Sequence, residues 1–253
     1  MNNRSLLIYI FTLFITSCSF NVDINKPVSL LWDKLDSESD TLIIFLPGLY
    51  DTAETFKEEK FFVIARDAGI KADMVAMNIH ISHLLQDVMI ERIEKDIFRY
   101  VKNKGYKNVW FVGFSLGGLN SLLFYQKHIR DICGVLVLSP YIADEELIKA
   151  LKQAGGIKNW QPNELENKKF IEKKLLLLWG WLQQQYSNNN LEQVFLGYGK
   201  QDRYIEAIKL FENILNKKNV VSVNGGHNWE TIRKIWKRKL LTRNKTDLLQ
   251  PCK

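Results

Sequence analysis

The chain has 253 residues, of which 46% are hydrophobic and 25% are charged. These values exclude an intrinsically disordered chain, and the length suits one sizeable α/β domain or two small ones. The formal charge of +7 at pH 7 raises the question of nucleic acid binding. Basic residues, however, stand beside acids in helical stretches such as 58–60 and 91–95, so we expect a solvated basic surface and no nucleic acid partner.

The chain begins with an apolar run over residues 6–15 that follows Arg4. Such a run is too short to span a hydrocarbon core of about 30 Å and is typical of a signal peptide. The segment 15–18, Ile-Thr-Ser-Cys, resembles the lipobox of bacterial lipoproteins. The resemblance implies a signal peptide over 1–17, cleavage before Cys18 and diacylglycerol on the Cys18 thiol. An uncleaved anchor, or an ordinary signal peptide with a chance cysteine, is the alternative.

The position after Cys18 carries Ser19. It lacks the aspartate associated with retention in the inner membrane, so the lipoprotein interpretation gives an outer-membrane address in a cell with two membranes. We therefore expect a lipid-anchored protein of the cell envelope, held to the membrane at Cys18 without a spanning helix.

From residue 41 onward, short apolar runs alternate with longer helical patterns, which is typical of a parallel sheet with crossover helices. The predicted strands are 41–46, 72–79, 108–113, 134–138, 193–197 and 220–223. The predicted helices are 56–68, 84–104, 117–128 and 229–241. We expect one α/β domain over 18–253, with a mostly parallel sheet flanked by helices.

The stretch from 140 to 191 interrupts this alternation. It has no strand pattern and is expected to form helices over 144–153 and 164–182. An insertion between two strands is a suitable place for a small helical cap or lid. The apolar segment 175–182 fits a lid and fits equally well a helix that packs on the core.

The pentapeptide Gly113-Phe114-Ser115-Leu116-Gly117 lies between a predicted strand and a predicted helix. A sharp strand-to-helix turn needs small neighbours on both sides, and it lifts a serine hydroxyl above the edge of the sheet. The helix entry also directs backbone N–H groups at that hydroxyl. This context indicates that Ser115 is a catalytic nucleophile, which the pentapeptide alone would not establish.

With this motif in place, residues 41–241 resemble the α/β-hydrolase family. The resemblance implies a catalytic acid after a later strand and a histidine base after the last strand. The matching residues are Asp202, just after the strand at 193–197, and His227, just after 220–223. His227 would take the proton of Ser115, and Asp202 would hold the imidazole in the required tautomer. Asp144 is the rival acid, because some relatives carry the acid after the preceding strand.

The other histidines have simpler interpretations. His128 ends the helix after Ser115, where a cation suits the helix dipole. His80 and His83 are three residues apart but have no placed carboxylate or third ligand. We therefore expect no metal site and no cofactor.

The oxyanion hole would take one N–H from Leu116, the residue after the nucleophile. The second N–H would come from the loop after the strand 41–46, with Leu49 as first choice and Tyr50 as second. Here the sequence departs from the family, because Pro47-Gly48 replaces the common His-Gly pair. The departure puts the hydrogen-bonded support of the loop in doubt, while the backbone donors are retained.

The remaining cysteines are Cys133 and Cys252. Cys133 lies in the apolar run 132–138, so we expect a buried core thiol there. A disulfide between the two is the alternative in an oxidising compartment.

These observations predict a serine hydrolase that cleaves a small acyl ester through an acyl-enzyme on Ser115. A lipase, phospholipase or acyltransferase acting on lipid esters is one alternative, suggested by the anchor and by the apolar segment 175–181. A non-catalytic envelope protein that uses the same scaffold for binding is another. The sequence does not specify the acyl group, the alcohol or the oligomeric state.

Overall fold

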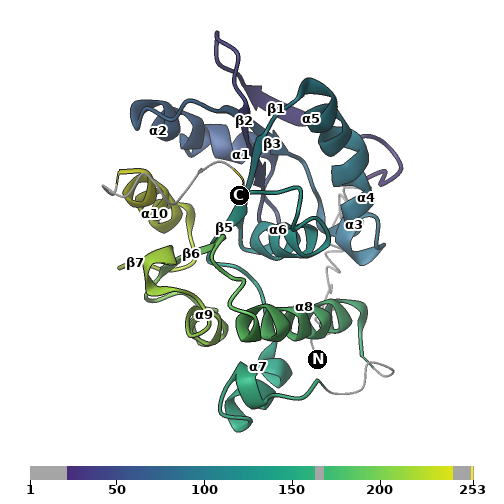
Figure 1. Ribbon diagram of the computed structural model, residues 1–253, viewed down its shortest axis with the longest axis vertical. Coiled ribbons are helices and arrows are strands. Elements are labelled where there is room, and N and C mark those ends of the chain that lie inside the picture. Colours follow the sequence, from purple (N-terminus) through teal and green to yellow (C-terminus); the bar gives the residue numbers. More distant parts are fainter. Residues whose placement is uncertain (1–21, 163–167, 242–251, 253) are drawn as a thin grey trace, which may run out of the picture.

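A seven-stranded sheet forms the centre of the protein in the computed structural model, which describes residues 22–162, 168–241 and 252 (Figure 1). Across the sheet the strand order is β1-β3-β2-β4-β5-β6-β7. All neighbouring strands are parallel except β1 and β3, which are antiparallel. The strands are β1 Leu30–Asp33, β2 Thr41–Leu46, β3 Asp73–Met77, β4 Asn108–Phe114, β5 Gly134–Leu138, β6 Val194–Gly199 and β7 Val220–Val223.

Helices cover both faces of this sheet. Figure 1 shows α1, α2 and α10 on one side of the strands and α4, α5 and α6 on the other. The helices are α1 Ala53–Glu58, α2 Phe61–Asp67, α3 Ile81–Leu85, α4 Met89–Ile93, the π-helix η1 Glu94–Phe98, α5 Arg99–Lys104, α6 Leu116–Lys127, α7 Glu145–Gln153, η2 Ile157–Asn159, α8 Phe170–Ser187, α9 Ile205–Glu212, η3 Lys217–Asn219 and α10 Trp229–Leu241.

The sheet separates two hydrophobic clusters, because successive side chains of a strand point to opposite faces. In β2, Ile44 belongs to the cluster under α6 and α8, whereas Phe45 belongs to the cluster under α1, α2 and α10. The central strands β3, β4 and β5 are buried along their whole length. A strand that is covered on both faces needs a continuous apolar run, and this is the pattern that predicted the strands.

Each predicted strand is found, and the expected α/β fold is confirmed. Strand β1 and helix α9 were not predicted. β1 is a half-buried edge strand of four residues, so its sequence lacks the long apolar run of the central strands. The single helix predicted over 56–68 is instead two helices, because Lys60 adopts a left-handed conformation with φ 61° between them.

The prediction of one continuous helix over 84–104 was wrong. α3 ends at Leu85, and Asp87 takes a left-handed backbone with φ 59° before α4 begins at Met89. The chain is then helical through α4, η1 and α5 until Gly105, which has φ 77° and caps α5. The helical spacing of apolar residues continues across the break, so the periodicity of the sequence does not reveal it; these residues are Leu85, Val88, Ile90, Ile93, Ile97 and Val101.

The insertion between β5 and β6 contains α7, η2 and α8. Helix α8 packs on the main core: Leu175, Leu178 and Leu182 have no exposed surface, and the Trp179 indole donates a 2.7 Å hydrogen bond to the Ile142 carbonyl. Of the two interpretations of 175–182, the structure therefore favours a core helix. Leu177, which is half exposed, is the exception.

Cys133 and Cys252 form a disulfide, and their Cα atoms are 4.5 Å apart. The expectation of a free core thiol at Cys133 was therefore wrong, although the residue is buried as expected. The bond joins the segment that precedes β5 to the C-terminal end of the chain, across a sequence separation of 119 residues.

None of the helices in the described part of the chain combines the length and the apolarity needed to cross a bilayer. Cys18 and the predicted signal peptide lie outside the described residues.

Candidate active site

Ser115 occupies a sharp turn between β4 and α6. Its backbone angles are φ 53° and ψ −113°, a strained conformation for a residue with a side chain. The glycines on either side allow this turn. A Cβ on Gly117 would lie 2.0 Å from the Leu46 carbonyl oxygen, and one on Gly113 would lie 2.1 Å from the Gly117 carbonyl oxygen. The pentapeptide thus forms a strand–turn–helix in which both glycines are required by close backbone approach.

The structure brings together the three side chains predicted from the sequence. Ser115 Oγ lies 2.9 Å from His227 Nε2. On the other side of the ring, His227 Nδ1 lies 3.0 Å from each carboxylate oxygen of Asp202. The side chains of His227 and Asp202 are 5% and 0% exposed, and Ser115 is 6% exposed, so bulk water competes little for these hydrogen bonds.

The loops that carry Asp202 and His227 are bonded to each other. The Gln201 N–H donates to the Gly225 carbonyl at 2.9 Å, and the Gly225 N–H donates to Gln201 Oε1 at 2.6 Å. One step earlier, the Lys200 N–H donates to the Val223 carbonyl at 2.8 Å. The acid and the base are therefore held in register by a continuation of the β6–β7 pairing.

Two opposing influences set the charge state of Asp202. Burial raises the pKa of its carboxyl, because a charge is poorly solvated away from water. The His227 imidazole, the neighbouring Ser139 hydroxyl and the Tyr204 N–H favour the charged form and prevail, so the pKa of Asp202 lies below its ordinary value. Asp202 is thus an anion at neutral pH, and it accepts a charge-assisted hydrogen bond from the His227 N–H.

Both expected oxyanion donors lie at the ends of neighbouring strands. Leu116 opens α6, and the first N–H groups of a helix have no acceptor within the helix. Leu49 lies in the turn after β2, and within the described residues its N–H has no hydrogen-bond partner. The Tyr50 N–H instead donates to the Gly48 carbonyl at 3.2 Å, so the second-choice donor is occupied.

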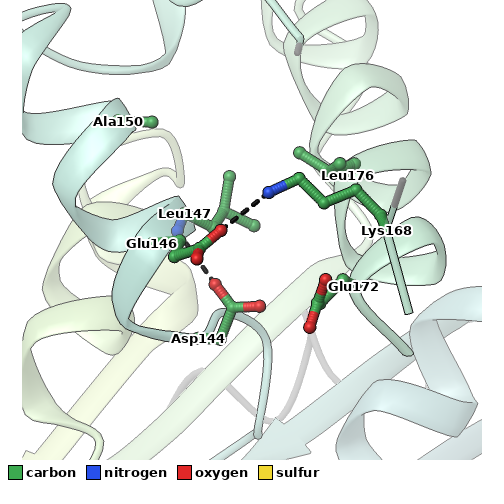
Figure 2. A pocket seen from close by; sticks show the side chains of 7 residues that line it. All are labelled: Asp144, Glu146, Leu147, Ala150, Lys168, Glu172 and Leu176. Atoms are coloured by element: carbon green, nitrogen blue, oxygen red, sulfur yellow. Dashed lines mark hydrogen bonds and ion pairs between the residues drawn. The ribbon is translucent and has the colours of Figure 1, made fainter. Parts of the chain in front are cut away.

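Asp144, the alternative catalytic acid, is the N-cap of α7. It caps α7 by accepting a 2.9 Å hydrogen bond from the Leu147 N–H. Figure 2 shows it at a small pocket between α7 and the start of α8, near the ion pair of Lys168 and Glu146. Because Asp202 contacts His227 directly, the geometry favours Asp202 over Asp144.

The other histidines are placed as structural groups. The Nδ1 atoms of His80 and His83 take part in the cap of α3, and His128 Nε2 lies 2.8 Å from Glu94 at the end of α6. No cluster of three metal-ligating side chains occurs among the described residues.

Two residues beside the site were missed by the sequence analysis. Asp51 accepts a 2.9 Å hydrogen bond from the Trp229 indole, which joins the loop after β2 to the start of α10. Both stand next to predicted site residues, Asp51 two positions after Leu49 and Trp229 two after His227. Proximity in sequence was the available signal, but a pairing across 178 positions leaves no local pattern.

Comparison with known proteins agrees with the topology. No family model and no curated protein matches the sequence. Among solved structures, the chain resembles S-formylglutathione hydrolase of Staphylococcus aureus (TM-score 0.62, 16% identity, covering 84% of this chain and 91% of that one). It also resembles Est1E of Butyrivibrio proteoclasticus (0.57, 17%, 85% and 93%) and the substrate-bound fluorophosphonate-binding serine hydrolase F of S. aureus (0.57, 15%, 85% and 98%).

These likenesses, with the strand order and the turn at Ser115, define the α/β-hydrolase fold. Solved structures that share this fold include a ferulic acid esterase and serine hydrolases, at 14–17% sequence identity.

Proposed function

We propose that the protein is a serine hydrolase that cleaves carboxylic esters, with Ser115, His227 and Asp202 as its catalytic triad. The observation that carries the proposal is the hydrogen-bond chain from Ser115 Oγ to His227 Nε2, at 2.9 Å, and from His227 Nδ1 to Asp202, at 3.0 Å. Serine is a weak nucleophile by itself, and this chain is the arrangement that activates it.

In the first half of the reaction, Ser115 Oγ attacks the carbonyl carbon of the ester while His227 Nε2 takes the hydroxyl proton. The carbonyl oxygen becomes an oxyanion and accepts hydrogen bonds from the Leu116 and Leu49 N–H groups. When this intermediate collapses, the bond to the alcohol oxygen breaks. His227 gives its proton to the departing alcohol, and the acyl group remains on Ser115.

In the second half, a water molecule replaces the alcohol. His227 takes a proton from the water as it attacks the acyl carbonyl, and the same oxyanion donors act again. Collapse breaks the bond to Ser115 Oγ, which recovers its proton from His227, and the carboxylic acid leaves. Asp202 remains ionised throughout and stabilises the imidazolium that forms in each half.

Hydrolysis of p-nitrophenyl esters tests this proposal. The full-length protein in detergent should release p-nitrophenol from the acetate or butyrate ester, and Ser115→Ala should lose about 10⁴-fold or more in kcat. Full activity in Ser115→Ala would exclude the mechanism. Esters of increasing chain length separate a small-pocket esterase, which should slow with long acyl chains, from a lipase or phospholipase, which should not.

We also propose that the enzyme is anchored in the cell envelope through a lipid on Cys18. The proposal rests on the lipobox-like segment 15–18, and the disulfide between Cys133 and Cys252 supports it because such bonds persist in oxidising compartments. Labelling with radioactive palmitate should mark the wild-type protein and not Cys18→Ser. Equal labelling of the two would exclude lipidation at Cys18.

A further inference from the structure

We propose that Asp51 and Trp229 are positioning residues that hold the Leu49 N–H in place as an oxyanion donor. The inference rests on the proposed function and adds residues to it. Its starting point is the 2.9 Å hydrogen bond from Trp229 Nε1 to Asp51 Oδ1, which links the loop after β2 to the helix that follows His227.

The loop that carries Leu49 has little support of its own. Leu49 is 37% exposed and Tyr50 is 92% exposed, so neither side chain anchors the loop in the core. Tyr50 also has φ 141°, a strained conformation for a residue other than glycine. Strain of this kind persists only where surrounding contacts impose it. The support must therefore come from elsewhere in the loop.

Asp51 supplies that support on the loop side. Its N–H and that of Tyr50 both donate to the Gly48 carbonyl, which closes a tight turn around Leu49. Its carboxylate folds back over the same glycine: a Cβ on Gly48 would lie 2.5 Å from Asp51 Oδ2. One carboxylate oxygen thus lies against Gly48, and the other accepts the hydrogen bond from the Trp229 indole.

Trp229 supplies a rigid partner for Asp51. Its ring is packed edge-on against three phenylalanines of the core: the ring centroids are 5.2 Å from Phe56, 5.5 Å from Phe61 and 4.8 Å from Phe114. Phe114 immediately precedes the nucleophile, and its ring centroid lies 5.0 Å from that of His227. Trp229 therefore contacts the segments that carry the nucleophile, the base and the oxyanion loop.

The Asp51–Trp229 bond also gives the loop the hydrogen-bonded support that the family's His-Gly pair would otherwise be expected to provide. With Pro47 before Gly48, no histidine side chain is present to hold the loop. The Asp51–Trp229 bond supports the loop from the opposite end. Because Leu49 would act on the oxyanion, a loss of this support should lower kcat more than it changes KM.

The test compares two tryptophan variants on p-nitrophenyl butyrate. Trp229→Phe keeps an aromatic ring and removes the N–H donor. Trp236→Phe, the matched control on the same helix, removes a buried N–H that donates to the Phe61 carbonyl at 3.0 Å, away from the loop. We expect kcat to fall about tenfold in Trp229→Phe, with KM within about twofold of wild type. Trp236→Phe should keep wild-type kcat.

The Asp51 variants test the same bond from its other side. Asp51→Asn keeps an acceptor oxygen and should retain kcat within about threefold, whereas Asp51→Leu should resemble Trp229→Phe. Thermal unfolding of each variant shows whether the fold is intact.

The outcomes separate the two proposals. If wild-type activity depends on Ser115 but Trp229→Phe and Asp51→Leu match Trp236→Phe, the positioning role is wrong and the proposed function stands. If Trp229→Phe raises KM and leaves kcat unchanged, the bond serves substrate binding and the inference is also wrong. If the wild-type protein has no Ser115-dependent esterase activity, both proposals fail.

Discussion

The loops after β4, β6 and β7 differ from the loop after β2 in how they are held. The first three are joined to a neighbouring strand or loop by backbone hydrogen bonds: the Ser115 N–H donates to the Leu138 carbonyl, and the Gln201 N–H donates to the Gly225 carbonyl. The loop after β2 makes its turn around Gly48 alone. Within the described residues, the Trp229 bond to Asp51 is what links residues 48–51 to a distant segment by a hydrogen bond.

The difference separates two ways of building one site. A triad on loops that extend the sheet is preorganised by the same bonds that form the fold, so its geometry is robust to changes elsewhere. An oxyanion loop held by one side-chain bond depends on a pair of residues far apart in sequence. Substitutions in the triad should therefore lower kcat more than substitutions in the oxyanion loop.

The largest effect is expected at Asp202. In Asp202→Asn the carboxylate that accepts the His227 N–H is lost, so the ring no longer has the tautomer that can take the Ser115 proton. We expect kcat on p-nitrophenyl butyrate to fall by about 10³ to 10⁴-fold at neutral pH, with KM little changed. A loss below tenfold would show that Asp202 is not the catalytic acid.

A smaller effect is expected in the oxyanion loop. The Cβ of Gly48→Ala would meet the Asp51 carboxylate at 2.5 Å and displace it, which should lower kcat by about 10 to 100-fold. Gly180→Ala is the matched control, because a Cβ there meets nothing within 4 Å and alanine suits the interior of α8. The control should keep wild-type kcat. Equal activity in both variants would remove the contrast between the two regions.

The disulfide should affect stability and leave catalysis unchanged. Cys252→Ser opens a loop of 119 residues, and we expect the free energy of unfolding to fall by about 2–4 kcal/mol. Activity at 25 °C should stay within twofold of wild type, about the scatter of such assays, because the bond is remote from the loops of the site. Urea unfolding of the oxidised protein measures the first quantity. No change in stability would show that the bond does not constrain the chain.

The smallest effect is expected in the pH dependence of stability at acidic pH. Because the pKa of Asp202 is lowered by folding, its carboxylate contributes stability that is present above its unfolded pKa of about 4 and is lost as the pH falls below it. Asp202→Asn lacks this titration. The stability difference between wild type and Asp202→Asn should therefore shrink between pH 5 and roughly pH 3. A constant difference over that range would contradict the lowered pKa.

The sequence was most informative where structure is specified locally. Strands such as β4 and β5 are buried on both faces and appear as continuous apolar runs. The glycines on either side of Ser115 indicate a sharp turn, because larger residues would clash with the backbone there. The resemblance to the α/β-hydrolases indicated Asp202 and His227, because it implies an acid after a later strand and a histidine after the last one. Both follow strands of a parallel sheet, which presents such loops at one edge.

The sequence did not indicate two kinds of feature: local breaks in an otherwise regular pattern, and contacts between residues far apart in the chain. The left-handed residue at Asp87 breaks a helix whose apolar stripe continues past it, and β1 lacks a buried run because it is an edge strand. The Cys133–Cys252 disulfide, which the sequence offered only as an alternative, and the Asp51–Trp229 bond join positions 119 and 178 residues apart, so no local pattern indicates either pairing. The sequence thus predicts the triad, whereas it does not predict the hydrogen bond that supports the oxyanion loop.

Labelling with a fluorophosphonate probe tests the central claim most directly, because the probe reacts with a serine only when base and oxyanion donors activate it. The full-length protein should gain one phosphonyl group, and peptide mapping by mass spectrometry should place it on Ser115. Ser115→Ala should remain unmodified under the same conditions. An unlabelled wild-type protein, or a label on any other residue, would contradict the assignment of Ser115 as the nucleophile.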